Sequence, residues 1–293
     1  MSKSENAEGI FLMLGATISF AVMAAATKAL HGGLPASEVV FIRSTLSTLA
    51  LILYFSWHQN RAWPGKKPVL LTARGVVGFI ALFFYFWALP QIHLGTAIML
   101  NYTAPLFAVI ASYFIFKEKT NTRAKLLITL SFLGVYILTA PQISEKPAAF
   151  LAALSSGFLA GMVHLLIRKS SREEESPFVI IFYFTSICIV GSLSFLPFTR
   201  WFFPDRQQWP LLIVITVSSF VGQLGLTCSL QKAPVSVVSP FGYITPVLGL
   251  ALGFFIWGEN PGFAGCLGSL VIILCGILLY TQQTQAVLLT RRK

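Results

Sequence analysis

The feature that most constrains the fold is a series of apolar runs, each about 20 residues long, separated by short polar gaps. A helix needs about 20 mostly apolar residues to cross the hydrocarbon core of a bilayer. Only 11% of the residues are charged, compared with about 25% in soluble domains. The pattern therefore predicts an all-α membrane protein with ten transmembrane helices. The expected spans lie near residues 10–30, 38–57, 69–89, 94–116, 125–140, 148–168, 177–197, 210–230, 235–257 and 262–281.

The basic residues predict how these spans are oriented. An even number of spans places both termini on one side, where fifteen of the 21 lysine and arginine residues fall, against four on the other side. Lysine and arginine are enriched in cytoplasmic loops. We therefore expect a multi-pass protein of the bacterial inner membrane with both termini in the cytoplasm. The net charge of +11 does not gather into a stripe or motif, which argues against nucleic-acid binding.

The chain also contains an internal repeat with an offset of 141 residues. A tyrosine, a proline and a glutamate recur in the same order: Tyr102, Pro105 and Glu118, then Tyr243, Pro246 and Glu259. The repeat divides the chain into units 1–142 and 143–293, each with five spans. Because five is odd, the second unit enters the membrane with opposite polarity, so we expect two inverted five-helix repeats around a central cavity. Inverted repeats are common in alternating-access transporters, whereas a duplication kept only for stability is the alternative.

The two prolines fall near the middle of the fourth and ninth spans. Proline removes a backbone donor and kinks a helix, and such breaks are tolerated in membranes where they face protein or a water-filled cavity. Interrupted spans at matching places in both halves point to a transporter's binding site. A simple packing kink is the alternative for each proline taken alone.

The segments around these prolines also carry a family resemblance. "NYTAPLF" followed by "FIFKEK", and "YITPVLG" followed by "FIWGEN", each stand near the end of a five-span unit. In these motifs the sequence resembles the EamA-type family of the drug/metabolite transporter superfamily, over about residues 9–281. The resemblance implies ten helices and an export function for amino acids or other metabolites, although some members of this family import their substrates.

Neutral polar and aromatic side chains are the predicted substrate contacts, because ligand pockets are mostly apolar with a few placed polar groups. The candidates flank the prolines or lie within the first, third and eighth spans: Asn101, Tyr102, Pro105, Tyr243, Pro246, Gln223, Trp87, Tyr85 and Ser19.

Charged residues predict gating more than binding. Glu118 and Glu259 end the proline-containing spans, where each could pair with a basic residue to close one side or could simply stop the span at the interface. Arg74 is expected to snorkel to the cytoplasmic surface. Arg43 could snorkel, pair with Glu38 or attract a substrate carboxylate, and a structural role is favoured. No carboxylate lies mid-span, which argues against a buried proton relay.

These features favour a secondary transporter that exports amino acids or related neutral or zwitterionic metabolites by alternating access. Uptake or exchange of a larger metabolite, such as a nucleoside-like compound of the S-adenosylmethionine type, is the alternative. A membrane-embedded enzyme is disfavoured because the chain has no HExxH or GxxxxGK[ST] motif and no acidic cluster in a span. No metal or other cofactor is expected, and the predicted partners are a small-molecule metabolite and the lipid bilayer.

Overall fold

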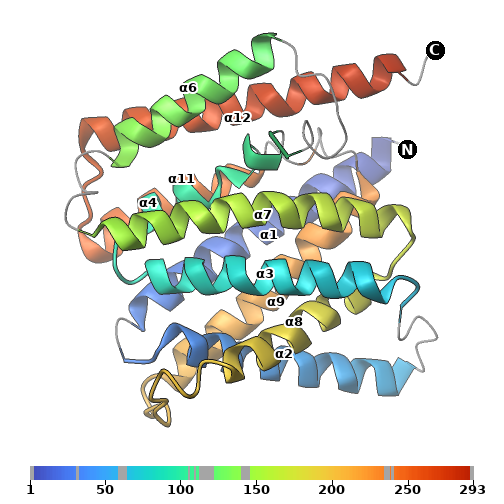
Figure 1. Ribbon diagram of the computed structural model, residues 1–293, viewed down its shortest axis with the longest axis vertical. Helices are drawn as coiled ribbons and strands as arrows, with labels where there is room; N and C mark the ends of the chain where they lie inside the picture. The colour runs from blue at the N-terminus through green and yellow to red at the C-terminus, as the bar shows by residue number, and fades with distance from the viewer. Residues whose placement is uncertain are drawn as a thin grey trace.

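The computed structural model describes residues 3–30, 33–58, 65–104, 106–108, 110–111, 122–139, 146–233, 238 and 241–290. Across these ranges the chain consists of helices joined by turns and loops, with no strand (Figure 1). The predicted all-helical class is confirmed. The helices are α1 (Lys3–Ala29), α2 (Ala36–His58), α3 (Pro68–Ala88), α4 (Leu94–Asn101), α6 (Thr122–Thr139), α7 (Pro147–Arg172), α8 (Pro177–Leu193), α9 (Trp209–Lys232), α11 (Ile244–Trp257) and α12 (Gly262–Thr290).

In the described part of the chain, five helices contain segments long and apolar enough to cross a membrane. They are Asn6–Ala29, Ala36–Trp57, Pro68–Ala88, Pro147–Ile167 and Trp209–Lys232. Helices α6, α8, α11 and α12 contain shorter apolar segments. Large apolar side chains also cover the outer surface, with Phe255 81% exposed and Phe11 and Phe263 similarly open. A soluble monomer rarely exposes so much contiguous apolar surface, so these side chains suit contact with lipid.

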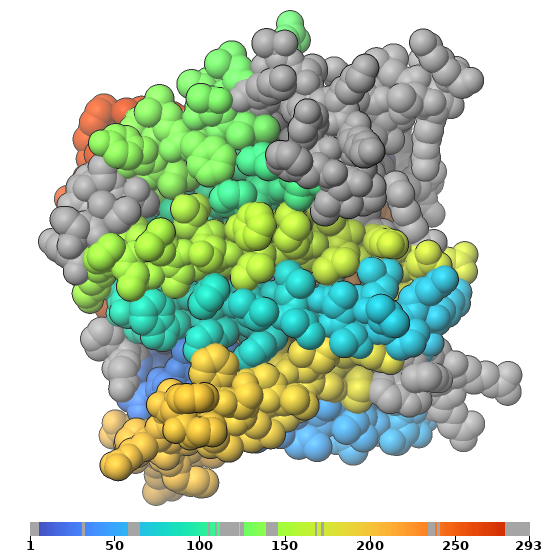
Figure 2. All heavy atoms as spheres, in the orientation of Figure 1, coloured from blue at the N-terminus to red at the C-terminus, as the bar shows by residue number. Residues whose placement is uncertain are grey.

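The helices pack in a pattern that repeats when the first five are exchanged with the second five. Helix α1 packs against α9 and α11, while α7, the first helix of the second unit, packs against α3 and α4. The contact of α2 with α9 is likewise matched by that of α8 with α3. The remaining major contacts join equivalent helices: α2 with α8, α4 with α11, and α6 with α12. Figure 1 shows α6 and α12 along one edge of the molecule and α2 and α8 toward the opposite edge, and in Figure 2 α3 and α7 form adjoining bands across one face.

The fourth expected span is interrupted near the proline at position 105, where a kink is expected. Helix α4 ends at Asn101, and Tyr102 adopts a φ of −77° and a ψ of 7° in the turn that follows. A proline at position 105 has no backbone N–H, so the carbonyl of Asn101, four residues earlier, loses its helical donor. Pro105 itself lies outside the described residues.

The ninth span is also interrupted, but not in the way that the sequence predicts. We expected one helix kinked at Pro246, whereas α11 begins at Ile244 after a turn at Tyr243. Pro246 therefore lies in the first turn of α11, where a missing N–H removes no helical hydrogen bond. The break precedes the proline, and both repeats break at the equivalent tyrosine.

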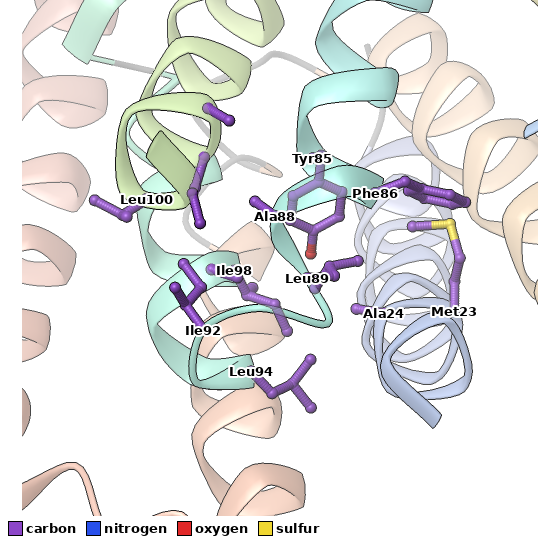
Figure 3. Close-up of a cluster of buried hydrophobic side chains, with 14 of the residues drawn as sticks. Met23, Ala24, Tyr85, Phe86, Ala88, Leu89, Ile92, Leu94, Ile98 and Leu100 are labelled. Carbon is purple, nitrogen blue, oxygen red and sulfur yellow. The ribbon is translucent and has the colours of Figure 1, made fainter. Parts of the chain in front are cut away.

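The largest apolar cluster fills the end of the bundle away from the N-terminal end of α1 and the C-terminal end of α12. Figure 3 shows Phe86 of α3 beside Met23 of α1, while Tyr85 points to another side of α3, toward Leu89 and the side of Ile98 of α4. Most of these side chains are almost completely buried. These side chains form a close-packed core, and a pocket of about 370 Å³ beside it is lined by Lys28, Ile92 and Phe150.

Candidate binding site

A cavity of about 260 Å³ lies between the two repeats. Helices α1, α3, α7 and α9 contribute to its walls, together with the segments on either side of the two helix breaks. Five predicted contact residues line it: Tyr85, Asn101, Tyr102, Gln223 and Tyr243. The lining continues along α7 and α9 as far as Ile167 and Leu230, near the ends of those helices that lie on the side of the termini.

Arg74 and Gln223 form the charged part of the cavity wall. Arg74 stands in the second turn of α3, where Gly78 leaves space one turn later, and its guanidinium Nη2 donates to Gln223 Oε1 of α9 at 3.0 Å. The guanidinium carbon also lies 4.1 Å from the centre of the Phe184 ring. Because Arg74 is only 1% exposed, the expectation that it snorkels to the surface is wrong. It turns inward because Gln223 offers an acceptor and Phe184 an aromatic face.

Arg43 is also buried, at 2% exposure, but it is not among the described residues that line the cavity. Its Nη1 donates to Ser219 Oγ of α9, and its guanidinium lies 5.7 Å from the Phe86 ring and 5.5 Å from the Phe184 ring. Glu38, an expected partner, instead accepts from the backbone N–H of Phe202. Arg43 therefore cross-links α2 and α9 and does not snorkel, in line with the structural role that the sequence favours.

The two tyrosines at the helix breaks meet at the cavity. The centres of the Tyr102 and Tyr243 rings lie 6.4 Å apart. Tyr102 Oη donates to Thr245 Oγ1 at 2.8 Å, and Thr245 Oγ1 donates to the carbonyl of Thr17 on α1 at 3.2 Å. This chain of hydrogen bonds ties the break of the first repeat to α11 of the second, so both repeats form this part of the wall.

Asn101 reaches the cavity where α4 crosses α7. Its Nδ2 donates to Ser156 Oγ at 2.9 Å. One turn along α7, a Cβ atom on Gly161 would lie 2.6 Å from the carbonyl oxygen of Ala104. Glycine at 161 thus permits a close approach of the two backbones, which fixes the position of Asn101 and Tyr102.

Other predicted contact residues lie elsewhere. Trp87 is 39% exposed and points away from the cavity that Tyr85 lines. Ser19 Oγ donates to the carbonyl of Gly15 in its own helix, and Ser19 is not among the described lining residues. Pro246 is buried in α11 without lining the cavity.

An ion pair stands at the densely packed end of the bundle. Lys28 Nζ, at the end of α1, lies 2.6 Å from Glu259 Oε1, and the two side chains are 8% and 11% exposed. Glu259 Oε2 accepts from the backbone N–H of Leu94 at 2.7 Å, and Lys28 Nζ donates to the carbonyl of Ile92 at 2.6 Å. The pair thus joins α1, the α3–α4 connection and the end of α11. Its predicted counterpart Glu118 lies outside the described residues.

Sequence reasoning missed several residues of the cavity wall. Phe184 of α8 and His164 of α7 line it, as do Met13 and Met23. His164 carried a polar signal that could have found it, but the apolar residues are indistinguishable in sequence from those that face lipid. Thr17 of α1, a polar residue of the first expected span, also lines the cavity.

Comparison with known proteins gives this geometry a context. The model of the EamA-like transporter family matches residues 7–140 and again residues 147–282. The chain belongs to the EamA-like transporter family. The two matches of this EamA-like protein correspond to the two sets of helices whose packing repeats.

Relatives of this EamA-like chain extend over nearly its whole length. It is 29% identical over 275 residues to the pseudopaline exporter CntI of Pseudomonas aeruginosa, covering 92% of this chain and 95% of that one. It is 22% identical to the S-adenosylmethionine uptake transporter of Rickettsia prowazekii, covering 90% of each. A solved crystal structure has a TM-score of 0.68 and 17% identity over 96% of this chain and 99% of the other, so the fold is shared.

Proposed function

We propose that this chain is an inner-membrane carrier that exports amino acids or related zwitterionic metabolites by alternating access. In this proposal it has ten transmembrane helices, arranged as inverted repeats 1–142 and 143–293, with both termini in the cytoplasm. The matched packing of the two helix sets supports a two-fold relation between the units. The excess of basic residues on the side of the termini supports the orientation.

One observation carries the proposal: a cavity lies between the two repeats at their helix breaks, and a buried ion pair stands beyond it at one end. Alternating access needs a central site that two mirror-related halves can expose in turn. The tyrosines of both breaks at the cavity wall support such a site. The proposed substrate contacts among the predicted residues are therefore Tyr85, Asn101, Tyr102, Gln223 and Tyr243.

Glu259 acts as a gate residue in this proposal. With cytoplasmic termini, the pair of Glu259 with Lys28 lies at the periplasmic end, and the apolar cluster around Tyr85 and Phe86 packs beside it. The lining residues extend toward the opposite end, as far as Leu230. These positions support an inward-facing state in which the periplasmic side is closed.

The cavity supports a small cargo. Its volume of about 260 Å³ lies just below the range for ligand sites, which runs from about 300 to 1,000 Å³. Amide and hydroxyl groups in a mostly apolar wall suit a metabolite with a few polar groups. Export is favoured because a pseudopaline exporter is among the relatives.

Uptake of a larger metabolite is the second candidate, and the S-adenosylmethionine uptake transporter among the relatives favours it. The aromatic faces of Tyr102 and Tyr243 would accept a cationic group by cation–π contact, worth about 0.5–2 kcal/mol. The direction of accumulation separates the two candidates, because a carrier follows the gradients that it meets.

The test compares the metabolites of medium and cytoplasm in cells that produce the parent protein or a Tyr102→Ala, Gln223→Ala double variant at equal membrane level. We expect an amino acid or related zwitterion to accumulate in the medium with the parent protein only. Trp87→Ala is the matched control, because it also removes an aromatic ring but from the outer surface, and it should export like the parent. Accumulation inside the cell would favour uptake, and identical profiles for parent and double variant would refute the proposal.

The topology has its own test. Alkaline phosphatase fused after α12 should be inactive and green fluorescent protein at the same place fluorescent, because the proposal puts that end in the cytoplasm. The reverse result would contradict the proposed orientation, and it would also place the Lys28–Glu259 pair at the cytoplasmic end.

A further inference from the structure

Arg74 brings a positive charge to the cavity wall without an acidic partner. Its guanidinium is protonated at any cellular pH, and the residue is 1% exposed. Only Nη2 has a hydrogen bond, to the neutral amide oxygen of Gln223, while Nε and Nη1 have no partner among the described residues. Gln223 therefore orients the guanidinium but leaves its charge uncancelled.

None of the acidic side chains that the structure describes lines this cavity. All four ion pairs in the described part of the chain use lysines: Lys28–Glu259, Lys66–Glu174, Lys67–Glu173 and Lys232–Glu8. Glu38 accepts from the backbone N–H of Phe202, and Glu175 accepts from those of Lys66 and Lys67. The other charged group against Phe184 is Arg43, which has the same sign. The cavity wall thus carries an excess of positive charge.

A buried charge without a counter-charge is unfavourable, so such a group is expected where a ligand supplies the missing partner. From this arrangement, and resting on the proposed transport function, we infer that Arg74 binds the carboxylate of the cargo. The cargo class is then amino carboxylates, that is, amino acids, and not the corresponding amides or amines. Charge-assisted hydrogen bonds from a guanidinium to a carboxylate are among the strongest in proteins.

The other polar groups of the cavity give the cargo a direction. Asn101 and Tyr102 line it at the break after α4, whereas Arg74 lines it from the second turn of α3. Their amide oxygen and aromatic face suit an ammonium group. In the proposed orientation the carboxylate therefore lies on the cytoplasmic side of the amino group, because Arg74 is in the second turn of α3.

The test measures binding of matched compounds to the purified full chain in lipid nanodiscs. The panel contains the proteinogenic amino acids, the corresponding amino acid amides and amines, and inorganic phosphate and sulfate. We expect at least one amino acid to bind at least tenfold more tightly than its amide, a difference of about 1.4 kcal/mol. Arg74→Gln should abolish this preference and Arg74→Lys should retain part of it.

Arg43→Gln is the matched control, since it removes an equally buried guanidinium that lies outside the cavity lining. It should change the acid-to-amide preference by less than threefold. The melting temperature of the ligand-free protein adds a second readout. Arg74→Gln should melt at or above the parent temperature, because it removes an uncompensated buried charge, so loss of binding cannot be assigned to misfolding.

The inference is overturned if no acid in the panel binds better than its amide, if phosphate or sulfate binds in place of the acids, or if Arg74→Gln keeps the preference. Flux in proteoliposomes, with the same compounds, separates this result from the proposed function. Transport of amines or amides would keep the carrier and refute the carboxylate site. Arg74-dependent binding of an acid without flux would keep the site and refute the carrier.

Discussion

The two repeats place their helices in matching positions but put different side chains at the cavity and in the core beside it. Arg43 and Arg74 of the first unit correspond, at the 141-residue offset, to Phe184 and Ile215 of the second. In the same way, Ser219 and Gln223 of the second unit correspond to Gly78 and Leu82 of the first. The cations therefore come from one half, and the neutral hydrogen-bonding groups that hold them come from the other.

Other positions are the same in both halves. The tyrosine at the helix break, the glutamate that follows it and the lysine near the end of the first helix all recur: Tyr102 and Tyr243, Glu118 and Glu259, Lys28 and Lys169. The residues that recur belong to the breaks and to the proposed gate, which two mirror-related states would both need. The recurring residues thus stand at the helix breaks and in the Lys28–Glu259 pair, while the positions that differ carry the buried cations and the groups that hold them.

The largest expected effect concerns a recurring position. Glu259→Gln should lower the free energy of unfolding by about 3 kcal/mol, because it leaves Lys28 buried without its counter-charge. Chemical denaturation in mixed micelles measures the loss. Lys66→Ala is the control: it breaks an ion pair with Glu174 whose side chains are 58% and 84% exposed, so its effect should stay within about 1 kcal/mol. Equal losses would show that the Lys28–Glu259 pair contributes no more than a surface contact.

The next effect concerns a position that differs between the halves. Ser219→Ala removes the hydroxyl that accepts from the buried Arg43 guanidinium and should cost about 2 kcal/mol of stability. The neighbouring Ser218→Ala removes a bond to backbone carbonyls of its own helix and should cost less than about 1 kcal/mol. The same denaturation experiment checks both. If Ser219→Ala were silent, α2 and α9 would not be joined through Arg43.

A smaller effect on stability is expected from glycine-to-alanine substitutions, and it should differ between α1 and α7, the first helices of the two units. Gly161→Ala on α7 places a methyl group 2.6 Å from the Ala104 carbonyl and should destabilise the protein by about 1–2 kcal/mol. On α1, a Cβ atom at Gly15 meets nothing within 4 Å in the described structure, so Gly15→Ala should be neutral or stabilise by about 0.5–1 kcal/mol. Thermal unfolding of both variants compares the crossings, and equal shifts would argue that they are equally tight.

The smallest effect tests the link between the halves at the cavity. A double-mutant cycle of Tyr102→Phe and Thr245→Val should give a coupling energy of about 1 kcal/mol, typical of one neutral hydrogen bond. The cycle is measured on unfolding free energies. Additive losses would mean that the two hydroxyls do not interact across the repeat boundary.

Much of the architecture could be predicted from the sequence, because apolar length and internal repetition are local signals. The helix breaks fall at Tyr102 and Tyr243, within three residues of the prolines at which the sequence predicts kinks. The residues of the candidate site were harder to predict from the sequence. Tyr85 and Trp87 were both predicted to line it, but residues two apart on a helix point to nearly opposite sides, and only Tyr85 lines the cavity.

The site contacts that could not be predicted are made between residues far apart in the sequence. Gln223 accepts a hydrogen bond from Arg74 across 149 residues of sequence. No local pattern near Arg74 indicates that the fold places an acceptor beside it. Position along the helix alone favoured snorkelling, since Arg74 lies close to the start of α3. Tertiary neighbours decide whether the Arg74 side chain lies at the surface or in the interior, and a single sequence does not show which residues those neighbours are.

In the proposed transport cycle, the ion pair between Lys28 and Glu259 bears on how evenly the closed and open forms of that end are populated. Burying two charges gives up hydration that their attraction roughly repays, so separating the pair into water need not be steeply unfavourable. The backbone groups of Ile92 and Leu94 that hold the pair can exchange it for water in the same way. A ligand that prefers one form by a hundredfold, about 3 kcal/mol, would then suffice to reverse which form predominates.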